Sequence, residues 1–162
     1  MSLASLLEVV LPPSCAGCSR YGTVLCGGCE NDLRPASDPT VSFLAADAAS
    51  LGGSEVELVV SAFRHEGVAR RCLQRLKYGG ARRLADPLAR AALPAFDDLL
   101  AVSGPAILVP VPVHVTRARE RGYNQALLLA GALGAARQLP VVELLTRPRA
   151  TQRQHALDRT AR

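Results

Sequence analysis

The sequence has no hydrophobic run long enough to cross a membrane. The longest unbroken run of apolar or small residues near a helix, Ala126 to Ala136, is far shorter than the ~20 residues that a membrane-spanning helix needs. The N-terminus also lacks the features of a secretory signal. It has no Lys or Arg before Pro12, and Glu8 lies within its apolar stretch. We therefore expect a chain without a membrane span that acts in the cytoplasm.

Tryptophan is absent, and lysine and aromatic residues are scarce. Three Phe and three Tyr offer few rings for stacking bases, so base-stacking recognition of single strands is weakly supported. Lys77 is the only lysine among nineteen basic residues. Arginine suits phosphate because its planar group donates two hydrogen bonds at once, although a GC-rich genome would also favour it. The chain has no G-x-S-x-G, P-loop or G-x-G-x-x-G motif, and its three histidines show no metal-ligand spacing.

Charge is distributed unevenly along the chain. Residues 1–60 contain two basic residues against seven acidic ones, a net charge of −5. Residues 61–162 contain seventeen basic residues against seven acidic ones, a net charge of +10, so the whole chain carries +5. This asymmetry predicts two units, the second with a surface that faces an anion. We expect a zinc-binding unit over residues 1–36, a linker over 37–54 and a second unit over 55–162.

Four of the five cysteines form two C-x-x-C pairs that are separated by seven residues: Cys15, Cys18, Cys26 and Cys29. Two such pairs on short turns can bring four thiolates to one tetrahedral metal ion at ~2.3 Å. A two-residue gap is short for an ordinary disulfide, and a cytoplasmic chain would not keep two of them. We therefore favour a closed, structural zinc site, with an iron–sulfur or redox role, or plain buried thiols, as the alternatives.

Two further expectations concern the surroundings of these cysteines. Gly17, Gly27 and Gly28 would let the backbone turn tightly around the ion. The fifth cysteine, Cys72, falls on the apolar face of a later helix with Val68, so we expect a small core residue there.

Strand and helix patterns alternate in the second unit. In chain order we expect a strand over 56–63, a helix over 66–78, a helix from 86 to about 100 that Pro94 can divide, a strand over 106–113, a helix opened by Asn124, and a strand over 140–145. A short amphipathic helix is also expected over residues 3–10. This alternation predicts an α/β fold in which a parallel sheet is connected by crossover helices.

An anion site is expected where the strand over 106–113 ends. Ligands of open α/β sheets bind at the carboxyl ends of strands. There the chain continues into a turn with Arg117, Arg119 and Arg121, followed by a helix start at Asn124, whose N–H groups can meet an anion. Phosphate, pyrophosphate or a nucleic-acid backbone would each fit, and a solvated basic loop is the structural alternative. The basic segment 147–162 is either a mobile loop that closes over an anion or a disordered terminus.

Several of these segments resemble the ComF family (competence protein F). The resembling segments, in order, are Leu11–Pro13 before the two C-x-x-C pairs, Leu76–Gly80, Pro110–Pro112, Arg119–Gln125, and the run Arg147, Arg149, Thr151, Gln154, Leu157, Arg162. The resemblance implies a zinc finger before a type I phosphoribosyltransferase fold over 55–162. It also implies binding of phosphoribosyl pyrophosphate with magnesium, and a cytoplasmic role with single-stranded DNA and the DNA-uptake machinery in natural transformation.

The resemblance also assigns residues to the ligand. The phosphate and pyrophosphate groups would be bound by Arg117, Arg119, Arg121, Gly122, Asn124 and Gln125, and the mobile loop would contain Arg147, Arg149, Thr151 and Gln154. No catalytic residue is assigned. Members of the fold carry two adjacent acids and a Gly/Thr-rich 5′-phosphate loop after a further strand. Asp97–Asp98 is not that element, because it follows Pro-Ala-Phe rather than a strand.

We therefore expect an incomplete phosphoribosyltransferase-like sheet that lacks its C-terminal part and exposes an apolar edge. Whether such a chain is an enzyme is left open. The alternatives to a phosphoribosyl-pyrophosphate-binding protein are a zinc-stabilised nucleic-acid-binding module and an inactive truncated product.

Overall fold

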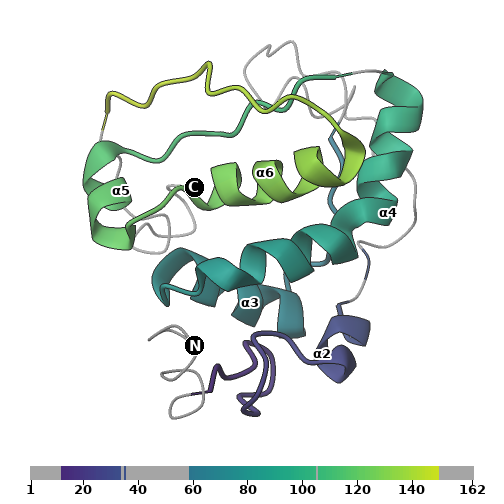
Figure 1. Cartoon of the computed structure of the whole chain (residues 1–162), viewed down its shortest axis with the longest axis vertical. Helices are drawn as coiled ribbons and strands as arrows, with labels where there is room; N and C mark the ends of the chain where they lie inside the picture. The colour runs from purple at the N-terminus through teal and green to yellow at the C-terminus, as the bar shows by residue number, and fades with distance from the viewer. Residues whose placement is uncertain (1–11, 34, 36–58, 105, 150–162) are drawn as a thin grey trace, which may run out of the picture.

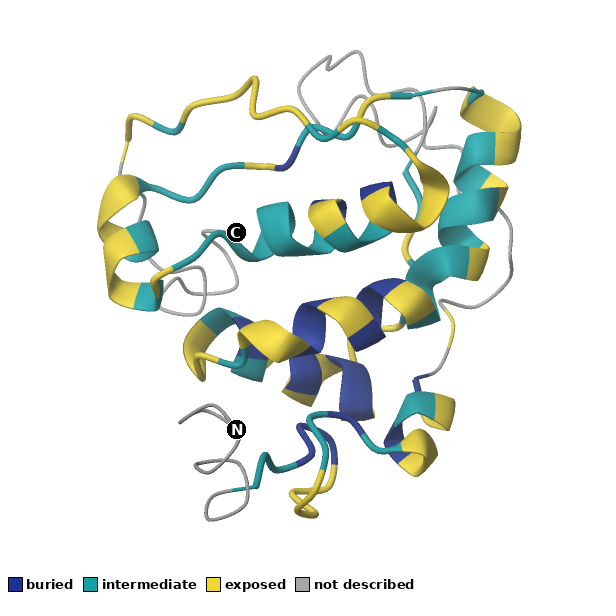
Figure 2. Ribbon diagram, viewed as in Figure 1, coloured by how far each residue is buried: buried dark blue, intermediate teal, exposed yellow. Residues whose placement is uncertain are grey.

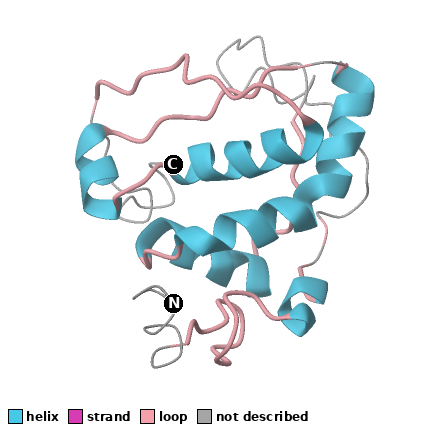
Figure 3. Cartoon of the chain, in the orientation of Figure 1, coloured by secondary structure: helices cyan, strands magenta, loops and turns pink. Residues whose placement is uncertain are grey.

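The computed structural model describes residues 12–33, 35, 59–104 and 106–149 (Figure 1). Its elements, in chain order, are α2 (Gly27–Asn31), α3 (Gly67–Tyr78), the 3₁₀ helix η1 (Arg82–Leu84), α4 (Ala85–Ser103), α5 (Val115–Arg121) and α6 (Gln125–Arg137). Within these residues the chain is helical and irregular, with no extended ladder of strands (Figure 3). The helix expected over 3–10 and the linker over 37–54 lie outside the described residues.

Three of the expected helices are confirmed. Helix α3 buries one face that includes Val68, Cys72 and Leu76, and Gly79 ends it by donating its N–H to the Arg75 carbonyl. Helix α6 begins where expected, since the Asn124 side chain accepts a hydrogen bond from the Ala126 N–H at 3.0 Å.

Helix α4 runs through Pro94 without being divided. Proline leaves the carbonyl four residues earlier, that of Arg90, without its helical partner. Both Pro94 and Arg90 are exposed, so water can satisfy this carbonyl. The helix ends at Gly104, whose φ of 75° favours glycine.

The arginine-rich segment after residue 113 is a helix and not the expected turn. Helix α5 is capped at its start by His114, whose Nδ1 accepts a hydrogen bond from the Thr116 N–H, and at its end by Gly122, which has a φ of 75°. Because helical neighbours lie four residues apart, Arg117 and Arg121 share one face and Arg119 lies on another.

The expected parallel sheet is not found in the described residues. One parallel bridge joins Leu108 to Val141, with the Leu108 N–H donating to the Pro140 carbonyl at 2.8 Å. Pro110, Pro112 and Pro140 have no N–H to donate, so the ladder cannot extend along this pair. The expected strand over 56–63 is likewise reduced, within its described part, to isolated bridges that include Phe63 with Pro35.

Helix α6 packs against both extended segments and against α4. A Cβ added to Gly134 would stand 2.7 Å from Val141 Cγ2 and 3.5 Å from Leu108 Cδ1, which shows how closely the helix approaches them. On its other side, Arg137 forms a two-point ion pair with Asp97 of α4, with both contacts at 2.6 Å. Asp97 therefore joins α4 to α6 through this ion pair.

The hydrophobic core lies between the cysteine-bearing loop, α3 and the start of α4 (Figure 2). Its fully buried side chains are Cys15, Cys72, Leu76 and Leu84. The N-terminal segment therefore shares one core with the helices that follow. Burying a large apolar side chain contributes about 1.5–3 kcal/mol, so the shared core stabilises both parts. Among the described residues, no helix is long and apolar enough to span a membrane.

Candidate functional site

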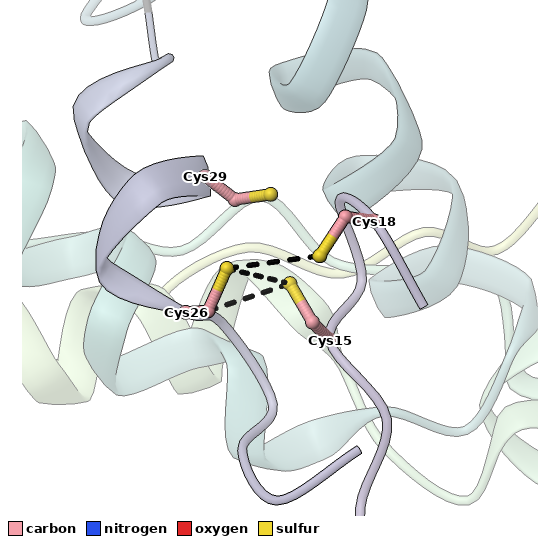
Figure 4. Close-up of side chains that lie close together, drawn as sticks. All are labelled: Cys15, Cys18, Cys26 and Cys29. Atoms are coloured by element: carbon pink, nitrogen blue, oxygen red, sulfur yellow. Dashed lines mark hydrogen bonds between the residues drawn. The ribbon is translucent and has the colours of Figure 1, made fainter. Parts of the chain in front are cut away.

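The four cysteines of the two C-x-x-C pairs form one cluster. Cys15 and Cys18 lie on the N-terminal loop, Cys26 precedes α2 and Cys29 lies within it, and the four sulfur atoms face a common centre (Figure 4). All four sulfur atoms lie within 4.8 Å of one another. Cys15 and Cys29 are buried and Cys18 is exposed, so the centre lies at the edge of the core.

The spacing of the sulfur atoms fits a tetrahedral metal. Cys26 Sγ lies 3.7 Å from Cys15 Sγ and 3.7 Å from Cys18 Sγ. Four sulfur atoms at about 2.3 Å from one zinc ion would stand about 3.8 Å apart. The cluster can therefore hold a metal ion such as zinc, with all four positions taken by protein ligands. Such a closed site stabilises structure and leaves no position for a reacting water.

The environment ionises one thiol of the cluster and opposes ionisation of another. Burial raises the pKa of Cys15, but hydrogen bonds from backbone N–H groups, including that of Cys26, outweigh it and lower the pKa to about 6. Burial and hydrogen bonds with the neighbouring thiols raise the pKa of Cys29 well above its ordinary value. Cys15 is thus a ready thiolate ligand, whereas Cys29 needs a cation to offset its burial.

Only one of the three glycines near the cluster is required by its geometry. A Cβ on Gly17 would stand 2.5 Å from Cys29 Sγ and 2.8 Å from Cys29 Cβ. At Gly27 and Gly28 an added Cβ would meet nothing within 4 Å, and neither has a positive φ. Gly27 and Gly28 are therefore not needed for a tight turn, and the lack of a side chain at Gly17 provides space for Cys29.

Two arginines of α3 attach the cysteine-bearing loop to the helix. Arg71 Nε donates to the Gly17 carbonyl at 2.8 Å, and Arg75 NH1 donates to Ser14 Oγ at 3.0 Å. These contacts lie beside the core that contains Cys72. Burial raises the pKa of Cys72 to about 11, which keeps it a neutral core thiol, as its place in the sequence predicted.

A second feature is a pocket of about 290 Å³ between the end of α3 and helix α5, which we call the basic pocket. Its lining residues are Lys77, Tyr78, Gly80, Arg117, Glu120, Arg121 and Tyr123. Three cations and one carboxylate therefore surround it. Local charge of this kind attracts anions, and the low-dielectric walls strengthen the attraction.

Arg121 is held in place at this pocket by two neighbours. Its guanidinium lies over the Tyr78 ring, 5.0 Å from the ring centre, and its NH1 donates to Gln125 Oε1 at 2.9 Å. Cation–π contact and a hydrogen bond together fix the plane of the guanidinium. A guanidinium group that is already held in place loses less conformational entropy on binding an oxyanion than a freely rotating one.

Tyr123, which also lines the basic pocket, is held by contacts with Leu76 and Arg82. The Tyr123 hydroxyl donates to the Leu76 carbonyl at 2.5 Å, and the Arg82 guanidinium lies 5.0 Å from the Tyr123 ring centre. Arg82 NH2 also donates to the Gly122 carbonyl. Burial raises the pKa of Tyr123 despite the opposing charges of Arg82 and Arg121, so its hydroxyl remains a donor at neutral pH.

The structure brings together only some of the residues expected to bind phosphate. Arg117 and Arg121 line the basic pocket, whereas the exposed Arg119 does not. Gly122 and Asn124 act locally, as the C-cap of α5 and the N-cap of α6. Gln125 contributes through its hydrogen bond to Arg121.

The expected mobile loop is described only in part. Arg147 and Arg149 lie on the extended segment after Val141, outside the lining of the basic pocket. Thr151 and Gln154 lie outside the described residues.

Sequence reasoning missed Lys77, Tyr78, Arg82 and Tyr123 as site residues. Lys77 and Tyr78 stand in the segment that resembles the ComF family, so their place in that motif was available as a signal. Nothing local to Arg82 indicates its role, because that role depends on contacts with residues about forty positions later.

No family model matches the chain, and neither a curated protein nor a solved structure matches it. The resemblance to the ComF family thus rests on the motif residues alone.

Proposed function

We propose that this chain is a zinc-stabilised, ComF-like protein that binds phosphoribosyl pyrophosphate through its phosphate groups at the basic pocket. The observation that carries the proposal is the convergence of Lys77, Arg117 and Arg121, from two helices, on one pocket. Two of these residues come from segments whose motifs resemble that family. Zinc would be held by the four-cysteine cluster, and its role would be structural.

The side chains of the basic pocket have distinct tasks in this proposal. Arg121, fixed by Tyr78 and Gln125, would donate paired hydrogen bonds to a phosphate oxygen pair. Lys77 would act as a point charge. Magnesium would accompany the pyrophosphate and share its negative charge. A cytoplasmic role with single-stranded DNA and the DNA-uptake machinery belongs to the same proposal.

The proposal concerns binding. Within the described residues the basic pocket holds no histidine, and its single carboxylate is that of Glu120, so it presents no obvious acid–base pair. What it does present is fixed positive charge, which serves binding and can also stabilise a departing pyrophosphate.

Calorimetric titration of the zinc-loaded chain with phosphoribosyl pyrophosphate and magnesium tests the proposal. We expect saturable binding of one ligand per chain, and weaker binding of ribose 5-phosphate, which lacks the pyrophosphate. Heat changes no larger than those of dilution at millimolar ligand would overturn it.

A nucleic-acid-binding module is the second candidate, favoured by the net charge of +10 on residues 61–162. It predicts binding of single-stranded DNA whose affinity falls steeply with salt, because counterions are released from the phosphates. Titration of a fluorescent oligonucleotide at several salt concentrations separates the candidates. A steep salt slope with no response to phosphoribosyl pyrophosphate would favour the module.

A further inference from the structure

A second pocket, of about 360 Å³, lies between the cysteine-bearing loop and α3. Gly17 and Ser19 line it from the loop, and Arg71, Gln74 and Arg75 line it from the helix. Tyr78 lines both this pocket and the basic pocket, so the two cavities are neighbours that share a wall. No residue assigned to zinc or to phosphoribosyl pyrophosphate above contributes a ligating group here.

The charge of the second pocket is uniformly positive. Its lining contains two guanidinium groups and no carboxylate, unlike that of the basic pocket, which includes Glu120. Arg71 is oriented by its Nε contact with the Gly17 carbonyl, and within the described part of the chain its two terminal amino groups have no other hydrogen-bond or ion-pair partner. Arg75 is held by the loop, since its NH1 donates to Ser14 Oγ and to the Ser14 and Cys15 carbonyls, and its NH2 donates to Ser19 Oγ. Arg71 can therefore donate hydrogen bonds to a phosphate, and Arg75 adds a second positive charge beside it.

The second pocket also offers a surface for a planar ring. Tyr78 is 54% exposed, and an exposed aromatic ring beside a cavity can stack against a flat ligand. Gln74 carries an amide that can both donate and accept, and Ser19 carries a hydroxyl, so the polar edge of a heterocycle would find partners. The volume falls in the usual range for sites that take small organic ligands.

We propose that the second pocket binds a nucleoside monophosphate, with the phosphate at Arg71 and Arg75 and the base against Tyr78. The class follows from the juxtaposition of two cations, a ring and an amide within one small cavity. The two pockets share Tyr78, but the phosphate of this ligand would meet Arg71 and Arg75, whereas the basic pocket offers Lys77, Arg117 and Arg121.

The test is calorimetric titration of the zinc-loaded chain with AMP, adenosine and inorganic phosphate. We expect one AMP per chain, and at least tenfold weaker binding of adenosine and of phosphate, since each supplies only half of the contacts. Equal affinity for AMP and phosphate would show that the base makes no favourable contact with Tyr78 and would overturn the proposed nucleotide. Absence of AMP binding would overturn the site.

Two matched variants locate the site. Gln74→Glu places a carboxylate in the second pocket, and we expect it to raise the Kd for AMP about tenfold or more. Arg70→Gln changes the net charge by the same amount on the same helix, outside this lining, and we expect less than a threefold effect, because exposed charges at a distance are screened. Gln74 and Arg70 are both exposed, so both variants should keep their zinc and their melting temperature.

Arg121→Ala separates this proposal from the function proposed above. AMP binding that survives Arg121→Ala and fails in Gln74→Glu supports the second pocket. AMP binding that fails in Arg121→Ala and survives in Gln74→Glu would place the ligand in the basic pocket and overturn this inference. Neither result depends on whether phosphoribosyl pyrophosphate binds.

Discussion

Gly17 and Cys29 are packed so closely that a methyl group on Gly17 would stand 2.5 Å from the Cys29 sulfur. The absence of a side chain at one residue thus allows a ligand from a separate C-x-x-C pair to reach the metal position. The same methyl group would also stand 3.1 Å from Val68 Cγ1 of α3. The metal centre and the core therefore depend on the same contact.

Gly17→Ala should disrupt the metal centre, since Cys29 Sγ would have to move away from the other three sulfur atoms. We expect loss of at least half of the bound zinc and a destabilisation of about 2–4 kcal/mol, measured by metal analysis and denaturant unfolding. Gly28→Ala is the control, because its added Cβ meets nothing within 4 Å. Full zinc content in Gly17→Ala would contradict the packing argument.

Cys26→Ser should release the zinc and unfold the N-terminal segment, because the stability of a structural zinc site is coupled to binding. Elemental analysis should give one zinc per parent chain and none per variant. Cys72→Ala is the control: it lies in the core and not among the four ligands, so it should keep its zinc while losing stability. Equal zinc content in parent and Cys26→Ser would refute the four-thiolate site.

Tyr123→Phe should lower the free energy of unfolding by about 1 kcal/mol, since the Leu76 carbonyl loses its hydroxyl donor. The ring remains, so the contact with Arg82 is kept. Tyr21→Phe is the control, because Tyr21 is 74% exposed, and it should change stability by less than about 0.5 kcal/mol. Urea unfolding of both variants measures the difference, and two equal values would count against the role of the hydroxyl.

Two glycine-to-alanine changes should have opposite effects on stability. Gly122 has a φ of 75°, which alanine adopts only with strain, and an added Cβ would stand 2.7 Å from Arg82 NH2. We therefore expect Gly122→Ala to lower the free energy of unfolding by about 1 kcal/mol. Gly131→Ala fills open space on the exposed face of α6, and we expect a gain of about 0.5–1 kcal/mol. Thermal unfolding monitored by circular dichroism checks both signs. A gain in Gly122→Ala would contradict the left-handed cap.

The sequence predicts best those features that local spacing determines. The four cysteines were found from their C-x-x-C pattern, and α3 and α6 from periodicity, Gly79 and the Asn124 cap. Helix α5 was missed because the segment between the proline-rich stretch and Asn124 was interpreted as an arginine-rich turn, although Arg117 and Arg121 have the four-residue helical spacing.

Features that depend on distant partners were not accessible in the same way. The prolines at 110, 112 and 140, which lack an N–H donor, are visible in the sequence, but the pairing of Leu108 with Val141 joins segments that no local pattern connects. The contacts of Arg82 with Gly122 and Tyr123 join segments that no local pattern connects. Arg117 and Arg121 line the basic pocket and Arg119 does not, because the segment is helical, which the sequence analysis did not predict.

The most direct test of the central claim is a side-by-side titration of the parent, Arg121→Ala and Arg119→Ala with phosphoribosyl pyrophosphate and magnesium. Both variants remove one arginine from α5, but only Arg121 lines the basic pocket. We predict a loss of affinity of tenfold or more for Arg121→Ala, as expected for a charged hydrogen bond of about 1.5–3 kcal/mol, and less than threefold for Arg119→Ala. Equal affinities in the three proteins, or a larger loss in Arg119→Ala, would contradict the account.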